Sequence, residues 1–212
     1  MEIKKTRGPG RPKDSSRKLA ILVSARKLFL EYGLDVTIDT IALNAGVAKS
    51  TVYSHFSDKE SLLEAVIRHE SDLTISDEQF KQSLSMPLNL VLKSFGLRYV
   101  RFINNREILG WDRLIAAAAV KSPQLPERFF AAGPGRGQYM LIALLSQAIA
   151  KGEIKRCEPH IAADYLTGLW LGFTSLEIKL GVRSILSDDE IETRVEQGID
   201  IFMSYYGPVK DE

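Results

Sequence analysis

The sequence has few of the features that indicate a secreted or membrane protein. Its 212 residues include one cysteine, Cys157, which excludes an internal disulfide and is typical of a reducing cytosol. No apolar run approaches the roughly 20 residues of a transmembrane helix. The first residues also lack the apolar segment of a signal peptide. We therefore expect a cytoplasmic protein without a membrane partner.

Histidine is scarce too, which argues against metal-dependent catalysis. His55, His69 and His160 have no metal-ligand spacing with Glu or Cys. His69 and Glu70 are not followed by the second histidine of a zinc-protease helix, and no nucleophile–base arrangement stands out. The sequence therefore predicts no enzyme activity, no metal and no cofactor.

Charge is balanced over the whole chain but not along it. The formal net charge is +1, so composition alone indicates no nucleic-acid partner. Up to residue 27, however, nine basic side chains face only two acidic ones, Glu2 and Asp14. Positive charge gathered in one segment is an electrostatic footprint for DNA phosphate. The basic residues are Lys4, Lys5, Arg7, Arg11, Lys13, Arg17, Lys18, Arg26 and Lys27.

Residues 1–14 are rich in Lys, Arg, Gly and Pro and are expected to form a flexible basic arm. Within it, Gly10-Arg11-Pro12 resembles the core of an AT-hook, a short segment that lies in the minor groove. A narrow A·T-rich groove would attract Arg11 strongly. The alternative is a basic tail that adds only nonspecific attraction, and the sequence leaves both open.

A helix-turn-helix pattern covers residues 37–56. Thr37 is a suitable N-cap for a first helix. Gly46 lies where that helix must end, because glycine adopts the left-handed conformation without a Cβ clash. A second short helix is expected from Lys49 to His55. Such a pair can place its second helix in the major groove of DNA.

The second helix of this motif is expected to present hydrogen-bond donors and no carboxylate, which suits phosphates and base edges. Ser57 and Glu60 have the spacing of a capping box for a third helix. Lys59 would then lie at a helix N-terminus that favours a phosphate. We predict that the DNA-contacting residues are Thr37, Lys49, Ser50, Thr51, Tyr53, Ser54, His55, Lys59 and, in the arm, Arg11.

The run GVAKSTVYSHFSDKESL, which begins at Gly46, resembles the DNA-binding signature of the TetR (tetracycline-repressor) family. The resemblance covers about residues 15–71. Residues 111–181 resemble the C-terminal domain of its AefR-like subgroup. Two departures are Ala48, where the family usually has a serine cap, and Ser50, where glycine is frequent. The resemblance implies a homodimer that binds a palindromic double-stranded operator.

The fold is predicted to be all-α, with about nine helices and no strand. We assign residues 15–72 to a TetR-type DNA-binding domain and residues 73–212 to a ligand-binding and dimerisation domain. Gly133-Pro-Gly-Arg-Gly137 is expected to interrupt the chain, and it lacks the flanking elements of a P-loop. Outside the helix-turn-helix, helices are expected at 15–32, 58–84 with a weak point at 74–76, 87–102, 106–121, a short one through 129–130, 138–151, 159–182 and 188–206.

Large aromatic side chains are frequent in residues 73–212. Each aromatic side chain, taken alone, can be explained as part of a helical core. Small-molecule sites, however, are also mostly apolar. In TetR-like proteins the resemblance implies a ligand cavity among these helices. The candidate ligand-binding residues are Tyr99, Phe102, Trp111, Phe129, Met140, Trp170 and Phe173.

The last two expected helices carry candidate subunit contacts. Gly168 and Gly172 are four residues apart, which allows another helix to approach closely. Val195, Ile199 and Phe202 recur along one face of the final helix. The resemblance implies a homodimer through these helices, and the alternative is packing within one chain only.

These patterns predict a transcriptional regulator. The leading interpretation is a repressor that a small apolar or amphipathic effector releases from its operator. The alternative is a ligand-independent or architectural DNA-binding regulator with a fully packed body. A void large enough for a ligand would favour the first, and a dense core the second.

Overall fold

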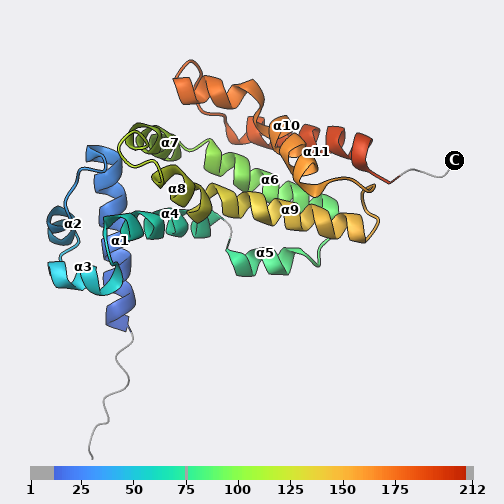
Figure 1. The fold of residues 1–212 in the computed structure, drawn as a ribbon. Coiled ribbons are helices and arrows are strands. Elements are labelled where there is room, and N and C mark those ends of the chain that lie inside the picture. Colours follow the sequence, from blue (N-terminus) through green and yellow to red (C-terminus); the bar gives the residue numbers. More distant parts are fainter. Residues whose placement is uncertain (1–11, 75, 209–212) are drawn as a thin grey trace, which may run out of the picture. The chain divides into compact units, whose positions relative to one another are not determined.

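The computed structural model describes residues 12–74 and 76–208, so Arg11 and most of the basic arm lie outside the described residues. Within these ranges the chain is helical and contains no strand, which confirms the all-α prediction. The chain divides into two compact units, with the boundary between Val66 and Ile67. The helices (Figure 1) are α1 Pro12–Tyr32, α2 Ile38–Asn44, α3 Lys49–His55, α4 Lys59–Thr74, α5 Asp77–Ser83, α6 Leu88–Ile103, α7 Arg106–Ala118, α8 Leu125–Ala132, α9 Pro134–Ala150, α10 Pro159–Leu180 and α11 Asp188–Tyr206.

The first unit, which we call the head, contains helices α1, α2 and α3 and the first half of α4. Its core is built from side chains at helical spacing, including Ile21 and Phe29 of α1, Ile41 of α2 and Val52 of α3, each fully buried. Helix α1 begins at Pro12 rather than at the expected residue 15. Proline is favoured in the first turn of a helix, where its missing N–H has no intrahelical partner to lose.

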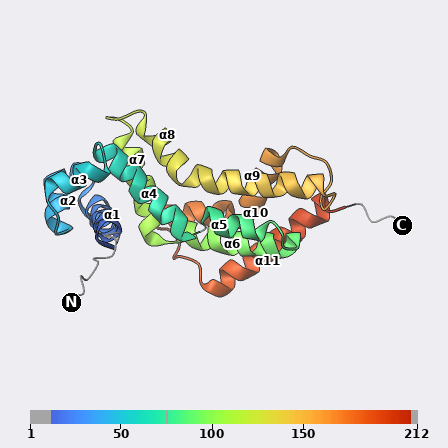
Figure 2. The same cartoon turned by 90° about the horizontal axis from the view of Figure 1, so that it is seen from below.

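The second unit contains the second half of α4 and helices α5 to α11. Figures 1 and 2 show α6, α9, α10 and α11 running alongside one another. Helix α11 packs on α6, and α10 packs on both α9 and α11. Trp170 of α10 and Phe202 of α11 are fully buried in the core that these helices share.

The prediction of one long helix at 58–84 is wrong, because α4 ends at Thr74 and a separate helix, α5, begins at Asp77. Ser76 is the N-cap of α5 and forms a capping box with Gln79. The Gln79 N–H donates to Ser76 Oγ, and the Ser76 N–H donates to Gln79 Oε1. This reciprocal cap starts a new helix at the weak point, so α5 is a separate element.

Two further boundaries differ from the sequence prediction. The interruption expected at 133–137 is present but confined to Gly133, between α8 and α9, where φ is −130° and ψ is −85°; α9 begins at Pro134 rather than at the expected residue 138. Helix α10 ends at Leu180 and is kinked at Gly172, where φ is 48° and ψ is −159°. Only glycine adopts this backbone conformation readily, so Gly172 supplies the kink.

Candidate DNA-binding site and ligand voids

The turn of the helix-turn-helix has the local structure that its residues favour. The Thr40 N–H donates to Thr37 Oγ1 at 3.2 Å, so Thr37 is the N-cap of α2. Gly46 has φ 65°, and the N–H of Val47 donates to the carbonyl of Ala42 at 3.0 Å. This is a Schellman motif, which ends α2 and turns the chain into α3.

Helix α3 presents an exposed polar face, as expected from the sequence. Lys49, Ser50, Tyr53 and Ser54 are exposed, and Thr51 is half-buried. Tyr53 combines an apolar ring with a polar hydroxyl, and the residue is 49% exposed on this face. No carboxylate lies on α3 itself.

His55 is a correction to this expectation. Its side chain is only 13% exposed, and its Nε2 lies 3.3 Å from a carboxylate oxygen of Asp14. His55 is covered because it lies in the last turn of α3, a helix that packs on α1. Its imidazole also lies 6.0 Å from the ring of the neighbouring Phe56. The His55 side chain therefore lies against α1 rather than open on the groove-facing side, and it forms an ion pair with Asp14 only when the imidazole is protonated.

Lys49 is exposed but paired. Its ammonium donates to the Asp39 carboxylate at 2.8 Å, and this hydrogen bond raises the pKa of Lys49 above its usual value. Both side chains are more than half exposed. Such pairs are screened by solvent, so the pair can open toward a phosphate.

The start of α4 differs in detail from the expected capping box. Asp58, not Ser57, is the capping residue: the Ser61 N–H donates to Asp58 Oδ1 at 2.6 Å, and the Asp58 N–H donates to Ser61 Oγ. Lys59 is in the first turn of α4, as expected, but it is half-buried and its ammonium donates to the carbonyl of Leu34. A phosphate at the start of α4 would have to compete with the Asp58 carboxylate for the helix N–H and with the Leu34 carbonyl for the Lys59 ammonium.

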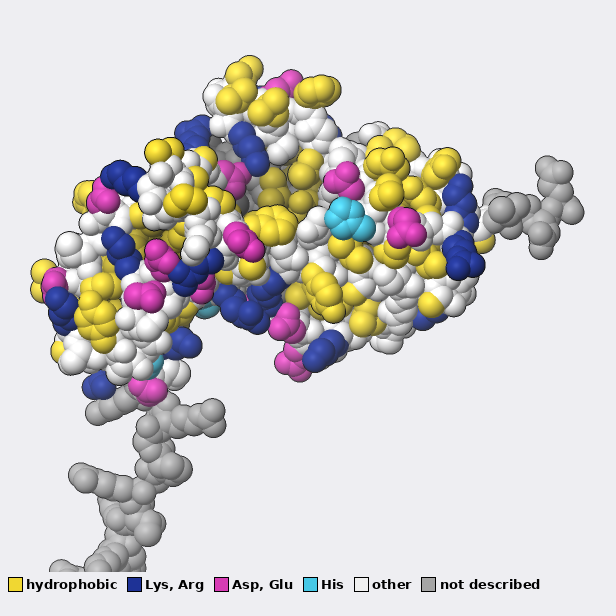
Figure 3. Space-filling view, viewed as in Figure 1, with side chains coloured by type: hydrophobic (Ala, Val, Ile, Leu, Met, Phe, Trp, Pro, Cys, Tyr) yellow, Lys and Arg dark blue, Asp and Glu magenta, His cyan; other side chains and the backbone are white. Residues whose placement is uncertain are grey.

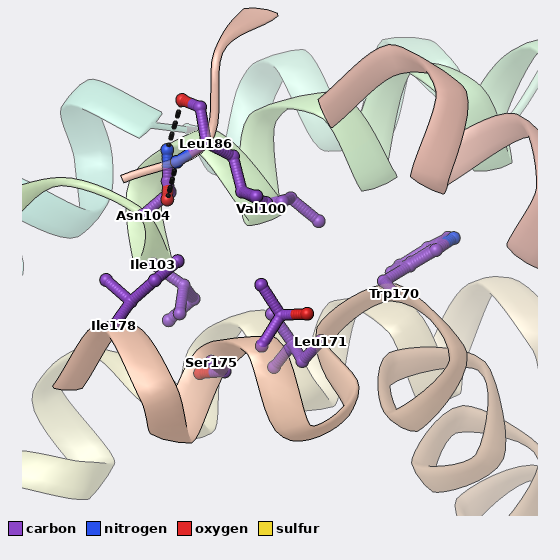
Figure 4. Close-up of a pocket in the computed structure, with 9 residues that line it drawn as sticks. Val100, Ile103, Asn104, Trp170, Leu171, Ser175, Ile178 and Leu186 are labelled. Carbon is purple, nitrogen blue, oxygen red and sulfur yellow. Dashed lines mark hydrogen bonds between the residues drawn. The ribbon is translucent and has the colours of Figure 1, made fainter. Parts of the chain in front are cut away.

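Two small, partly open voids lie within the second unit. One of about 50 Å³ is lined by Ser71 and Thr74 of α4, by residues of α6 and by Gly133, Pro134 and Gly137 around the start of α9. The other, of about 20 Å³, lies between α6 and α10 (Figure 4). Ile103 lines both, so one side chain stands between them.

The polar residues that line the smaller void are Asn104, Thr174 and Ser175. Asn104 Nδ2 donates to the carbonyl of Leu186 at 3.0 Å, and the Leu186 N–H donates to Asn104 Oδ1 at 2.9 Å (Figure 4). Both residues are buried. The paired hydrogen bonds satisfy the buried amide and fix the segment before α11 against the end of α6.

The predicted ligand-binding residues divide into three groups. Tyr99 and Phe102 line the larger void, and Trp170 lines the smaller one. Trp111 and Met140 are buried and Phe129 is half-buried, but none of them is among the residues lining these two voids. Phe173 is wrong as a cavity residue: it is 85% exposed, because the kink at Gly172 turns the helix immediately before it.

The predicted dimer residues also need correction. Val195, Ile199 and Phe202 are buried in the chain's own core, so this stripe of α11 packs inward. Gly168 and Gly172 are exposed and line a groove of about 860 Å³ on the outer side of α10 and α11.

The outward apolar residues that sequence reasoning missed are Tyr165, Leu176, Ile201 and Tyr205, each more than half exposed. In the space-filling view, apolar side chains gather on the surface over α10 and α11 (Figure 3). The signal was a second apolar stripe, with Ile201 and Tyr205 four residues apart beside the core stripe. An exposed apolar patch of this kind marks an interaction surface.

Within the described ranges, no helix is long and apolar enough to cross a membrane. Over the same residues, no three His, Cys, Asp or Glu side chains are grouped so that they could hold a metal ion.

Comparison with protein families matches both parts of the chain. Residues 21–66 match the model of bacterial regulatory proteins of the tetR family, and residues 90–208 match the C-terminal domain of the AefR-like transcriptional repressors. The chain is 34% identical over 166 residues to the uncharacterized HTH-type transcriptional regulator YdeS of Bacillus subtilis. The aligned region spans 75% of this chain and 78% of that protein. It is 38% identical over 58 residues to the HTH-type transcriptional regulator EthR of Mycobacterium tuberculosis, 27% of each chain.

Solved structures have the same fold. A putative TetR-family regulator from Mesorhizobium loti superposes with a TM-score of 0.76 at 24% identity, over 94% of this chain and 100% of that one. The flavonoid-responsive regulator FrrA superposes with a TM-score of 0.71 at 28% identity, over 92% of this chain and 100% of that one. The chain therefore belongs to the TetR family of helix-turn-helix transcriptional regulators, with a C-terminal domain of the AefR-like type.

Proposed function

We propose that this regulator is a repressor that binds a palindromic operator as a homodimer and leaves it when a small apolar or amphipathic effector binds. In this proposal residues 1–14 form a DNA-binding arm, residues 15–72 the DNA-binding domain and residues 73–212 the effector and dimer domain. It acts on DNA rather than on a substrate, and we place it in the cytoplasm. The observation that carries the proposal is the exposed donor face of α3 within the family signature.

For DNA contact we propose Tyr53, Lys49, Ser50 and Ser54 as the residues that reach base edges and nearby phosphates. Their side chains are exposed on one short helix, and donors of this kind match the acceptor groups of the major groove. Thr37, Thr51 and Lys59 would contact the backbone, Lys59 after leaving the carbonyl of Leu34. His55 supports the position of α3 through Asp14.

The outer face of α10 and α11 supports the homodimer. It contains the groove lined by Gly168 and Gly172 and the exposed apolar side chains Tyr165, Ile201 and Tyr205. A stable subunit interface excludes charge at its centre and buries aromatic and aliphatic residues. We therefore assign the subunit contact to this outward face, and not to the inward stripe that contains Phe202.

The effector site we propose is the pair of voids on either side of Ile103. Phe95, Tyr99 and Trp170 form an aromatic cluster between them, with ring centroids 6.0–6.3 Å apart. The voids are far smaller than the roughly 300 Å³ of a typical ligand pocket. The effector would therefore bind a more open conformation and shift the population toward it.

The small size of these voids also favours the second candidate function, a ligand-independent DNA-binding regulator with a packed body. The two candidates differ in what an apolar ligand does. The name of FrrA describes a flavonoid-responsive protein, so the flavonoid naringenin is a reasonable first ligand.

The test combines DNA selection with ligand binding. Duplexes selected from a random pool by the wild-type protein should be palindromic, and light scattering should show one dimer per duplex. A ligand that raises the melting temperature should also release the selected duplex. Failure to select any duplex would refute the regulator proposal for this chain. A selected duplex that no apolar ligand in a broad panel releases would favour the ligand-independent function.

A further inference from the structure

Arg136 lies in the first turn of α9 and is held by acidic residues of two other helices. Its guanidinium is 2.7 Å from the Asp72 carboxylate at the end of α4 and 2.7 Å from the Asp77 carboxylate at the start of α5. It also donates to Ser71 Oγ at 3.2 Å. The Arg136 side chain is only 12% exposed, whereas the two aspartates are about half exposed. We name Arg136, Asp72 and Asp77 the Arg136 cluster.

This position is unfavourable for an arginine unless it is paired. The N-terminal turn of a helix carries a partial positive charge, which repels a cation. Burial adds a desolvation cost that only good hydrogen bonds offset. The two short contacts to Asp72 and Asp77 supply that compensation, so the position of α9 depends on where the two aspartates lie.

The glycines around Arg136 bring α9 close to its neighbours. A Cβ on Gly133 would lie 2.8 Å from Cγ2 of Ile67 in α4, and a Cβ on Gly135 would lie 3.0 Å from Phe130. Larger residues would push the start of α9 away from α4. Gly133 and Gly135 therefore allow close packing at the start of α9, where Arg136 meets the end of α4.

The larger void borders the same contact. Ser71 and Thr74 line it from the last turn of α4, and Gly133, Pro134 and Gly137 line it from the start of α9. Helices α4 and α9 form two walls of this void and α6 forms a third, so movement of α4 or α9 away from α6 would widen it. Either movement changes the geometry of the Arg136 cluster. Helix α4 is also the covalent continuation of the chain from the head, whose compact unit ends at Val66.

We propose that the Arg136 cluster fixes the last turn of α4 in the conformation that binds the operator. Arg136 is then a positioning residue for operator binding that touches neither DNA nor effector. The inference rests on the proposed function. It identifies the contact that holds the end of α4, the helix that continues from the head.

The experiment compares Arg136→Met, which removes the charge but keeps the length of the side chain, with Arg101→Met. Arg101 forms a similar ion pair, 2.8 Å from Asp188, that joins α6 to α11 away from α4. Three quantities are measured well below the melting temperature: affinity for the duplex selected by the wild type, dimer mass, and hydrogen exchange of residues 67–74. Arg136→Met should weaken binding by about tenfold and speed exchange in residues 67–74, at unchanged dimer mass. Arg101→Met should change neither.

A merely structural role would lower the melting temperature of Arg136→Met and leave affinity and exchange as in the wild type, and this result would overturn the proposal. If Arg136→Met does not fold, the milder Asp72→Asn and Asp77→Asn variants are subjected to the same measurements with the same criteria. If the wild type selects no duplex, the proposed function fails, but exchange in residues 67–74 still decides whether the cluster holds α4.

Discussion

Trp170 of α10 packs directly on Gly198 of α11, so closely that no side chain fits between the two helices. A Cβ on Gly198 would lie 2.6 Å from Cδ1 of the indole. The indole Nε1 also donates to the carbonyl of Val195 at 3.3 Å, one turn earlier in α11, which holds the ring against the same helix. The close approach of α10 and α11 therefore depends on the absence of a side chain at Gly198.

From this contact we expect Gly198→Ala to destabilise the protein. The added methyl group would force the fully buried indole or a helix to move, at a cost of about 1–3 kcal/mol in the free energy of unfolding. Gly137→Ala is the matched control, since a Cβ there meets nothing within 4 Å. Alanine should stabilise that helix by about 0.5–1 kcal/mol. Urea unfolding measures both, and an unchanged or higher stability of Gly198→Ala would contradict the packing argument.

The sequence predicted helix-forming segments better than their ends and better than the directions in which their side chains point. Helix α11 runs from Asp188 to Tyr206 as expected, because a Ser187–Glu190 capping box and a regular apolar stripe both specify it. The stripe of Val195 and Phe202 looked equally suitable for a core or a subunit contact. Periodicity identifies a buried face but not what buries it.

The kink in α10 could not be predicted either. A glycine within an apolar helical run is compatible with a straight helix, and Gly168 is an example in the same helix. What distinguishes Gly172 is its tertiary setting, where Thr174 accepts a 2.6 Å hydrogen bond from Arg194 of α11. The prediction that Phe173 lines a cavity is wrong for the same reason: it assumes a straight helix, in which this side chain would point in a different direction.

The exposed ring of Tyr53 should contribute to operator affinity. Tyr53→Ala is expected to weaken binding to the selected duplex by about 1–3 kcal/mol while the melting temperature stays close to that of the wild type. Tyr32→Ala is the matched control, because this tyrosine is also exposed in the head but lies at the end of α1. Shift assays at one salt concentration compare the two. Equal affinities of Tyr53→Ala and the wild type would remove α3 as the recognition helix.

Adjacent positions on α11 should separate the subunit contact from the core. Ile201 is 55% exposed in the outer groove, whereas Phe202 is 1% exposed and stacks 4.7 Å from the Tyr206 ring. Ile201→Arg should give a folded monomer, since a charge at the centre of an interface is unfavourable. Phe202→Arg should instead unfold the domain, because it buries an unpaired charge. Light scattering and circular dichroism distinguish these outcomes, and a persisting Ile201→Arg dimer would place the subunit contact elsewhere.

Acid should remove the stabilisation that Asp77 provides. The hydrogen bond from Arg136 holds the pKa of Asp77 below its ordinary value, whereas in the unfolded chain the pKa is about 3.9. A carboxyl whose folded pKa is depressed stabilises the protein above the unfolded pKa, and this contribution disappears as pH falls through the folded pKa. Asp77 is 58% exposed, so solvent screening limits the gain to below about 1 kcal/mol.

Wild type should accordingly be more stable than Asp77→Asn at pH 7, and the difference should be smaller at pH 3, which lies below the unfolded pKa of about 3.9. Urea unfolding at the two pH values, in constant salt, measures this difference. The Arg136→Met background is the control, because there the effect of Asp77→Asn should be smaller: only the more distant Arg68, 3.7 Å from the carboxylate, still forms an ion pair with Asp77. A difference that stays constant between pH 7 and pH 3 would show that the Asp77 carboxylate contributes nothing through its charge.

The basic arm is tested through Arg11, which lies outside the described residues and stays a sequence prediction. Deleting residues 1–13 should weaken DNA binding and reduce its salt dependence, because fewer counterions are released. A nonspecific tail and a minor-groove arm both predict this result. Only the groove interpretation predicts that Arg11→Ala alone causes much of the loss, and mainly on operators with A·T-rich flanks, where the narrow groove concentrates negative potential. Lys5→Ala, which removes one charge outside the Gly-Arg-Pro core, is the matched control. Affinities on A·T-rich and G·C-rich flanks decide between the two, since equal small losses for both variants on both flanks would leave only a nonspecific tail.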